Sequence, residues 1–197
     1  MGCRDSTACL GCRTRLRRIA QRAGSRPKPH QGRHHPRLKK YAPTAWYETN
    51  PFDVEPGIHP PFSFGKVKDE ILQDGLKSVN FVRFLAGLPD DVTLDEGLTE
   101  MQQAGVILLA HIGGGLSHTP PRPETVPEDF YRLAYRSTSS SNLASGFPTI
   151  FSSIVNGYMR DNSGSNIFTV GHRRWILNPY MQKTMFGIAY NPASLYR

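Results

Sequence analysis

The feature that most constrains this chain is a sharp change of composition near residue 40. Residues 1–40 carry twelve Lys and Arg against one acidic residue, whereas residues 41–197 carry twelve against fifteen. All three cysteines (Cys3, Cys9 and Cys12) also precede residue 40. The segment 41–197 must therefore fold around an apolar core without a disulfide, and it is long enough to bury such a core.

Residues 1–40 have the composition of a disordered basic tail, with few large apolar side chains among many Arg, Lys, His, Gly and Pro. The first six residues fit an N-myristoylation sequence. A Cys-x2-Cys pair (Cys9 and Cys12) with a later His-x3-His pair (His30 and His34) resembles a zinc finger, with a long, proline-interrupted gap between the pairs. A solvated tail is the interpretation that the composition favours.

The net charge of residues 41–197 is −3, which argues against nucleic-acid binding by the folded domain. No apolar run approaches the ~18 residues that span a membrane. No apolar segment follows the basic start, so no secretory signal peptide is visible.

The chain after the tail divides into two segments. Residues 41–65 alternate prolines with aromatic residues, which predicts an extended strap lying on the body. Residues 66–197 show helical periodicity, which predicts helices over about 66–86, from Thr93 to about 112, and over about 148–159. Thr93 and Glu96 match a capping box for the second of these helices.

Short extended pieces are expected near 174–178 and 184–190. Several helices followed by late, short strands predict helices layered on a small sheet, an α+β fold.

Two histidines lie in loops rich in Gly and Pro. His118 follows Gly-Leu-Ser and precedes Thr-Pro-Pro, and His172 follows Val-Gly and precedes Arg-Arg-Trp. Imidazole transfers protons or binds metal near neutral pH more readily than other side chains. We expect the two loops to converge on one cleft.

These histidines belong to a set of motifs that, in this order, resembles the CAP superfamily (cysteine-rich secretory protein, antigen 5 and pathogenesis-related-1) in its cysteine-free bacterial form. The matching residues are Asn80-x-x-Arg83, Leu116-Ser117-His118, Asn142-Leu143-Ala144-x-Gly146, Tyr158-x-x-Asp161, and Gly171-His172 with Trp175.

The resemblance implies a three-layer α/β/α sandwich over residues 66–197, with further sheet beyond Arg197, so that the domain is C-terminally incomplete. It also implies a groove with two histidines and two acidic residues. These fall on His118, His172, Asp161 and Ser141. Serine replaces the Glu that many members have at position 141, which puts a hydrolase with paired carboxylates in doubt.

The resemblance further implies an extracellular or cell-envelope domain that binds a small or lipid-like ligand, or a protein partner, through a groove containing His118, Ser141, Asn142, Asp161 and His172. The alternative is a metal-assisted, protease-like hydrolase, since His118, His172 and Asp161 are a plausible ligand set for a divalent ion such as zinc. Without metal, the same groups could serve as general acid and base. A third interpretation is that the histidines only brace their loops.

Other polar residues have simpler explanations. His111, at the end of the second helix, favours the helix dipole and solvent over the site. Ser139, Ser140 and Ser141 lack the strand–turn–helix elbow of a nucleophile. Arg173 and Arg174 either bind an anion or pair with acids of the body such as Glu124, Glu128 or Asp129.

Overall fold

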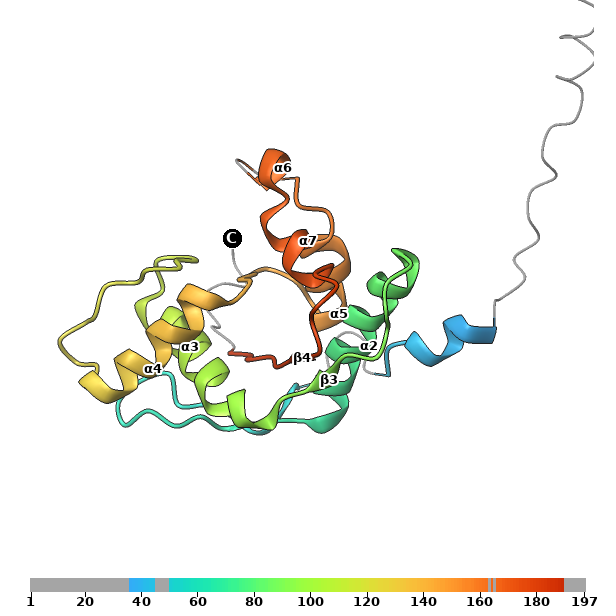
Figure 1. Ribbon diagram of the computed structural model, residues 1–197. Helices are drawn as coiled ribbons and strands as arrows, with labels where there is room; N and C mark the ends of the chain where they lie inside the picture. The colour runs from blue at the N-terminus through green and yellow to red at the C-terminus, as the bar shows by residue number, and fades with distance from the viewer. Residues whose placement is uncertain (1–35, 45–49, 163, 165, 190–197) are drawn as a thin grey trace, which may run out of the picture. The chain divides into compact units, whose positions relative to one another are not determined.

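Helices predominate in the part of this chain that the structure describes, and its strands are short. The structure is a computed structural model that describes residues 36–44, 50–162, 164 and 166–189 (Figure 1). The chain divides into two units, Met1–His35 and Pro36–Arg197. The N-terminal lipidation and zinc-finger motifs fall in the first unit, outside the described residues, and stay predictions. All that follows concerns the second unit.

The first structured element lies partly inside the predicted tail. The 3-10 helix η1 (Pro36–Tyr41) includes five residues that the sequence assigned to the tail. It ends at Tyr41, which is buried and lies against the rings of Phe81 and Phe84. Burial of this aromatic ring explains why Pro36–Tyr41 form a helix inside the predicted tail.

The helix α2 (Asp69–Leu85) forms where the apolar spacing predicts one. Ile71, Val79 and Val82 face the core, as expected, and acidic residues in the first turn suit the helix dipole. Leu85 is an exception to the predicted inner face, because it is exposed. Lys66–Val67, which precede the cap residue Lys68, form the strand β2 instead of the first turn of the helix.

The predicted start of the second long helix is wrong. Thr93–Leu94 form the strand β3, Glu96–Leu98 form the 3-10 helix η2, and the helix α3 runs over Thr99–Ile112. Backbone hydrogen bonds across the chain replace the capping box: the Thr93 N–H donates to the carbonyl of Gln182. Pairing with a distant strand thus overrides the local helix signal.

The helix α4 (Glu128–Ser140) was not predicted. Its inner face carries small and polar residues, Ala134, Ser137 and Thr138, so its apolar periodicity is weak. α4 packs along α3 (Figure 1). The two helices approach closely at Gly105, where a Cβ atom would overlap the Ser137 hydroxyl and lie 2.6 Å from the Ser137 Cβ.

We therefore expect Gly105→Ala to lower the free energy of unfolding by about 2 kcal/mol, because the added methyl forces the helices apart. The better helix propensity of alanine, worth ~1 kcal/mol, offsets only part of this cost. Urea denaturation of the full chain measures the difference. Gly105→Ala combined with Ser137→Gly should recover most of the loss; equal stability of the single and double variants would contradict the packing argument.

The third predicted helix is present but irregular. α5 (Ile150–Ser152) continues directly into the π-helix η3 (Ser153–Tyr158). Thr149 caps it, since its hydroxyl accepts the Ser152 N–H, and Pro148 lies just outside the cap. The helix therefore falls within the predicted range of about 148–159, but it begins at Ile150, after the cap residue Thr149.

The extended piece predicted near 174–178 is wrong, because this region begins inside a helix. α6 (Asn166–Thr169) is followed by α7 (Gly171–Ile176). Of the extended piece predicted at 184–190, only Thr184 lies in a strand, β4 (Lys183–Thr184), and residues 185–189 form no strand.

The described residues contain two small sheets. β1 (Phe52–Val54) pairs antiparallel with β2, and β3 pairs parallel with β4. The fold is therefore α+β, as predicted. In the part of the chain that the structure describes, no helix is long and apolar enough to cross a membrane.

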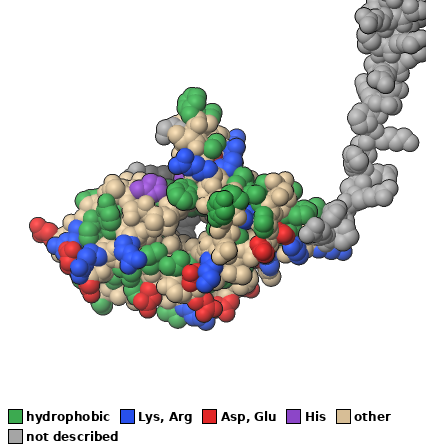
Figure 2. Space-filling model, viewed as in Figure 1, with side chains coloured by type: hydrophobic (Ala, Val, Ile, Leu, Met, Phe, Trp, Pro, Cys, Tyr) green, Lys and Arg blue, Asp and Glu red, His purple; other side chains and the backbone are tan. Residues whose placement is uncertain are grey.

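Three apolar clusters form the core. One joins α2 to η3 and α7, a second joins α3 to α4, and a third lies under β1 and β2. Aromatic residues of the segment 41–65 complete them, since Phe52 is buried and the Phe62 ring stacks on Phe130 at 4.7 Å. Trp46 and Tyr47 lie outside the described residues. Acidic side chains gather on the surface away from α6 and α7 (Figure 2).

Candidate functional site

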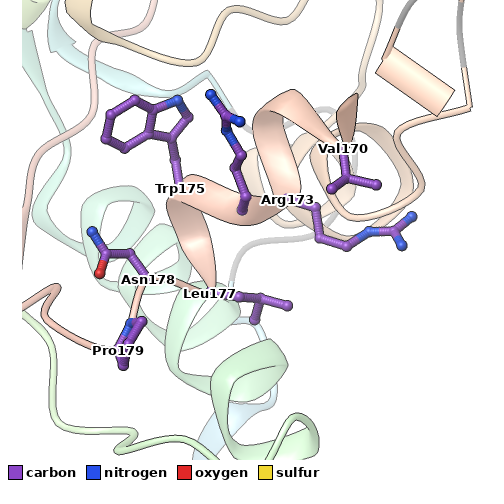
Figure 3. A pocket seen from close by; sticks show the side chains of 7 residues that line it. Val170, Arg173, Trp175, Leu177, Asn178 and Pro179 are labelled. Atoms are coloured by element: carbon purple, nitrogen blue, oxygen red, sulfur yellow. The ribbon is translucent and has the colours of Figure 1, made fainter. Parts of the chain in front are cut away.

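The helix α7 and the residues after it border an open hollow of about 550 Å³ (Figure 3). This volume is within the range of ~300–1,000 Å³ typical of small-molecule sites. None of the five predicted groove residues lines the hollow. The lining is largely apolar with two arginines, and it includes Val170, Arg174, Trp175, Leu177, Asn178 and Pro179.

Asp161 lies well before α7 in the sequence, but its side chain binds the first residues of that helix. It follows η3, has a positive φ of 47° that aspartate tolerates, and has a fully buried side chain. One carboxylate oxygen accepts the backbone N–H groups of His172 and Arg173, both at 3.1 Å. Asp161 thereby satisfies N–H groups that the first turn of a helix leaves without partners.

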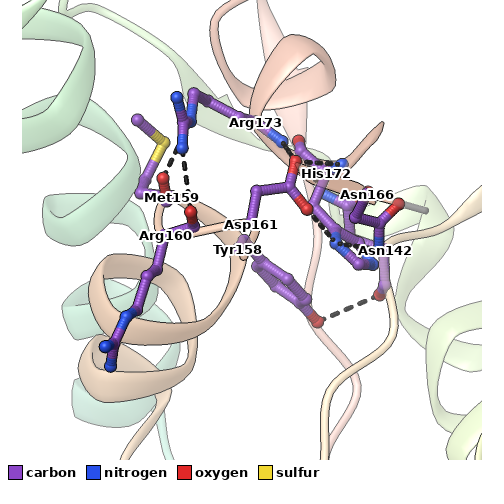
Figure 4. Close-up of polar contacts among 8 residues, drawn as sticks. All are labelled: Asn142, Tyr158, Met159, Arg160, Asp161, Asn166, His172 and Arg173. Carbon is purple, nitrogen blue, oxygen red and sulfur yellow. Dashed lines mark hydrogen bonds and ion pairs between the residues drawn. The ribbon is translucent and has the colours of Figure 1, made fainter. Parts of the chain in front are cut away.

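Asp161 also binds the imidazole of His172 (Figure 4). Its other oxygen lies 2.9 Å from His172 Nδ1. Burial by itself raises the pKa of Asp161, but the hydrogen bonds from the Arg173 N–H and from His172 outweigh it and lower that pKa. The carboxylate is therefore ionised and can only accept, so in the neutral imidazole Nδ1 carries the proton and Nε2 carries the lone pair.

Two further residues fix the His172 ring and its backbone. The Tyr158 ring stacks on the imidazole with centroids 5.2 Å apart. The Tyr158 hydroxyl donates to the Asn142 carbonyl at 3.1 Å, and the Asn142 amide donates to the His172 carbonyl, also at 3.1 Å. Burial raises the pKa of Tyr158, so its hydroxyl remains a donor. The structure thus joins three of the candidate residues, Asn142, Asp161 and His172, in one hydrogen-bonded network.

His118 and Ser141 attach to the end of α4. His118 Nδ1 lies 2.7 Å from the Thr138 carbonyl, and the His118 ring is exposed. Ser141 donates to the Gln102 side chain at 3.1 Å and does not join the Asp161–His172 pair. Thr138 precedes Asn142 by four residues, so both histidine loops are hydrogen-bonded to the same short stretch of chain. A shared cleft between the two rings remains a prediction.

The predicted metal site is not assembled. Within the described ranges, no group of three or more His, Cys, Asp or Glu side chains is placed to hold a metal ion. The Nδ1 of His118 points to a carbonyl, and the Nδ1 of His172 points to Asp161. His118, His172 and Asp161 therefore do not fit a zinc ion as a three-ligand set.

The predicted partners of Arg173 are wrong. Its guanidinium donates to the carbonyls of Met159 and Arg160, at 2.8 and 2.9 Å, and so closes the turn that carries Asp161 (Figure 4). Glu128, which the sequence offered as a partner, pairs with Arg122 instead.

His111 has a local structural role at the end of α3. Its Nδ1 lies 2.9 Å from the Ile58 carbonyl, and its ring contacts those of His59 and Phe62 edge-on. Its Nε2 lies 3.2 Å from the Thr125 hydroxyl. These contacts tie α3 to the segment around residue 60.

The Asn-x-x-Arg motif on α2 supports the site through the backbone. Asn80 forms two hydrogen bonds with the backbone of Val92. Arg83 is completely buried and donates to the carbonyls of Pro89, Ile176 and Asn178, so it fixes the exit of α7.

Two neighbours of the histidines were missed by sequence reasoning. Thr138 supplies the carbonyl for His118, and the Asn166 amide nitrogen lies 3.3 Å from His172 Nδ1. A backbone carbonyl leaves no trace in side-chain identity, so Thr138 had no signal. Asn166 lies just after the Asn-Ser-Gly-Ser turn, which predicted only a loop.

No protein-family model, curated protein or solved structure matches this chain. The likeness to the CAP superfamily therefore depends on the motif residues and on how the structure arranges them.

Proposed function

We propose that residues 66–197 form a CAP-type domain that binds a small or lipid-like ligand through the imidazole of His172. The observation that carries this proposal is the bond between His172 Nδ1 and the buried carboxylate of Asp161. A buried carboxylate that holds one ring nitrogen fixes both the orientation and the tautomer of a histidine.

The ring nitrogen of His172 that does not contact Asp161 determines which hydrogen-bonding group a ligand must present. His172 Nε2 has no hydrogen-bond partner among the described residues, and the side chain is 21% exposed. With Nδ1 protonated, Nε2 is an acceptor. The carbonyl on His118 Nδ1 also requires a proton there, which makes His118 Nε2 an acceptor as well. Two acceptor imidazoles favour a ligand that presents a hydroxyl or another donor.

Cholesterol, an apolar molecule with a single hydroxyl donor, is a suitable probe. We expect tritiated cholesterol to bind the full chain, and His172→Asn to weaken binding about fivefold, the effect of one lost hydrogen bond of ~1 kcal/mol. Asparagine keeps an N–H donor for Asp161 but has no group at the position of Nε2.

His59→Gln provides the matched control, because His59 is exposed and lies outside the Asp161–His172 network. This variant should bind cholesterol as the wild type does. Absence of binding to the wild type, or equal binding by His172→Asn, would reject the proposal for this ligand class. Thermal unfolding of each variant separates lost binding from lost folding.

We also infer the three-layer α/β/α arrangement for this domain, with β3 and β4 in the middle layer. Their parallel pairing supports it, because parallel strands are covered by helices on both faces. Gly187, three residues after β4, lies close against the α3 backbone at Gln102. A crystal structure in which a third strand joins β3 and β4 between two helical layers would establish the arrangement.

The motif resemblance supports an extracellular or cell-envelope location for the domain. Immunodetection of the chain in the culture medium and in envelope fractions of the producing cells tests this location. Detection in the cytosolic fraction alone would reject it.

A further inference from the structure

Large apolar side chains are exposed to water around α6 and α7. Phe168 is 90% exposed, Tyr180 88%, Trp175 62% and Ile167 55%. Figure 2 shows hydrophobic side chains together with basic ones over α6 and α7. Large apolar groups clustered on one surface mark an interaction site more often than isolated exposed ones do. We call this surface, made of Arg160, Ile167, Phe168, Arg174, Trp175 and Tyr180, the α6–α7 surface.

The part of the sequence that contains this surface has a large excess of basic over acidic residues. From residue 130 onward the sequence has seven Lys and Arg and one acidic residue, Asp161. The side chain of Asp161 is fully buried, so this part of the sequence exposes no acidic side chain. Residues 41–129, by contrast, have fourteen acidic residues against five basic ones. Arg160 and Arg174 are both exposed, so this surface is basic on an acidic body.

The hollow beside α7 adds a place for an anionic group. Arg174, Trp175 and Asn178 contribute to its lining. Guanidinium groups bind phosphate oxygens in pairs, and an indole ring lies well at the boundary between apolar chains and polar head groups.

We propose that the α6–α7 surface docks the protein on an anionic phospholipid bilayer. Phe168 and Trp175 enter the interfacial region, and Arg160 and Arg174 contact lipid phosphates. Tryptophan and tyrosine concentrate at this depth of membranes, and each basic residue near an anionic surface contributes ~1 kcal/mol of attraction.

Two other occupants fit the surface less well. A nucleic acid would leave two of the exposed side chains, Ile167 and Phe168, without a phosphate contact, because neither has a polar group. Ile167 also has no aromatic ring on which a base could stack. A second copy that met this surface with its own would bring Arg160 and Arg174 against arginines of the same charge.

Tryptophan emission tests the proposal at the surface itself. The chain has two tryptophans, so Trp46→Phe leaves Trp175 as the single reporter in the full chain. The probes are phosphatidylcholine vesicles and vesicles in which a third of the lipid is phosphatidylglycerol. We expect Trp175 emission to shift to shorter wavelength, with protection from acrylamide, only with the anionic vesicles.

A second reporter controls for binding through another part of the chain, above all the basic tail. Leu85→Trp, with Trp46 and Trp175 both replaced by Phe, places the single tryptophan at a comparably exposed position on α2. Its emission should stay unchanged with vesicles. Sedimentation with vesicles without a Trp175 shift, or no sedimentation, overturns the proposal. A short-wavelength Trp175 emission before vesicles are added also overturns it, because the surface is then already covered by this chain or by a second copy.

Substitutions on the α6–α7 surface measure how much single side chains contribute to partitioning into anionic vesicles. Arg174→Gln should weaken partitioning into anionic vesicles about fivefold, and Phe168→Ala about tenfold. Arg132→Gln is the matched charge control, because Arg132 is exposed on α4, and it should change partitioning less than twofold. Equal effects of Arg174→Gln and Arg132→Gln would show that only net charge matters and would overturn the proposal.

Discussion

Replacing Arg83 with alanine is expected to lower the free energy of unfolding by about 4 kcal/mol, which is large for a single substitution. Arg83 is completely buried, and its guanidinium donates to the carbonyls of Pro89, Ile176 and Asn178 at 2.7–2.9 Å. Alanine leaves three acceptors without a donor and opens a cavity. Chemical denaturation of the full chain, followed by circular dichroism, measures the loss.

Two variants show whether the hydrogen bonds or the volume of Arg83 matter. Arg83→Met keeps much of the volume and also removes a buried charge whose Nη2 has no partner in the described part of the chain. It should cost less than Arg83→Ala. Arg132→Ala, at an exposed arginine, should stay within about 0.5 kcal/mol of the wild type. If Arg83→Ala were as mild as Arg132→Ala, the proposed brace at the exit of α7 would be wrong.

Replacing Asp161 with alanine is expected to cost about 3 kcal/mol at neutral pH. The Asp161 carboxylate satisfies the N–H groups of His172 and Arg173 and binds His172 Nδ1. Alanine removes all three bonds and also strains the backbone at φ 47°. We further expect this variant to lose ligand binding through His172, because nothing then fixes the tautomer of the ring. Denaturation and the cholesterol assay measure the two effects.

The same residue makes stability depend on pH in a defined direction. The pKa of Asp161 is lower in the folded chain than in the unfolded chain, where an aspartate titrates near pH ~3.9. Its contribution is therefore complete above that pH and is lost as the pH falls through the folded-state pKa. Asp161→Asn should flatten the acid side of the stability curve, measured by denaturation from pH 6 downward to about pH 3.

The contribution of Asp90 to the pH dependence of stability must be distinguished from that of Asp161. Hydrogen bonds from Lys40 and Tyr41 lower the pKa of Asp90 to about 2, so Asp90 also loses its contribution in acid. Asp90→Asn measures this second component, and Asp161→Asn with Asp90→Asn should flatten the curve further than either alone. An unchanged acid slope in Asp161→Asn would contradict the ionised, hydrogen-bonded state of Asp161.

The helices differ in how well their sequence predicted them. α2 has a strong apolar stripe that ends at Gly87 and Pro89, and its range was predicted closely. α4 has Ser137 and Thr138 on its buried face, so its periodicity was too weak to detect. α7 lies in a segment with extended character, and it became a helix because Asp161, eleven residues before His172, accepts its first N–H groups.

The candidate site shows a similar division. Motif spacing identified Asn142, Asp161 and His172, which the structure joins in one hydrogen-bonded network. The same motifs predicted a metal-ligand set with His118, which the described residues do not assemble. A motif specifies residue types in order, whereas ligation depends on where each ring nitrogen points. Here Asp161 contacts Nδ1 of His172, so its carboxylate does not lie beside the free Nε2, where a metal ion bound by this ring would be.

By itself, the sequence determined the separation of a basic tail from an acidic, cysteine-free body, the α+β class, the helix α2, and which polar residues were candidates for the site. These properties follow from composition and from contacts between residues near one another in the chain. Only the tertiary structure decided that Thr93 enters a strand, that residues 171–176 form a helix, and that His172 is held by Asp161 while His118 is held by the end of α4. Each of these depends on hydrogen bonds between residues distant in sequence, which form only once the core has brought their segments together.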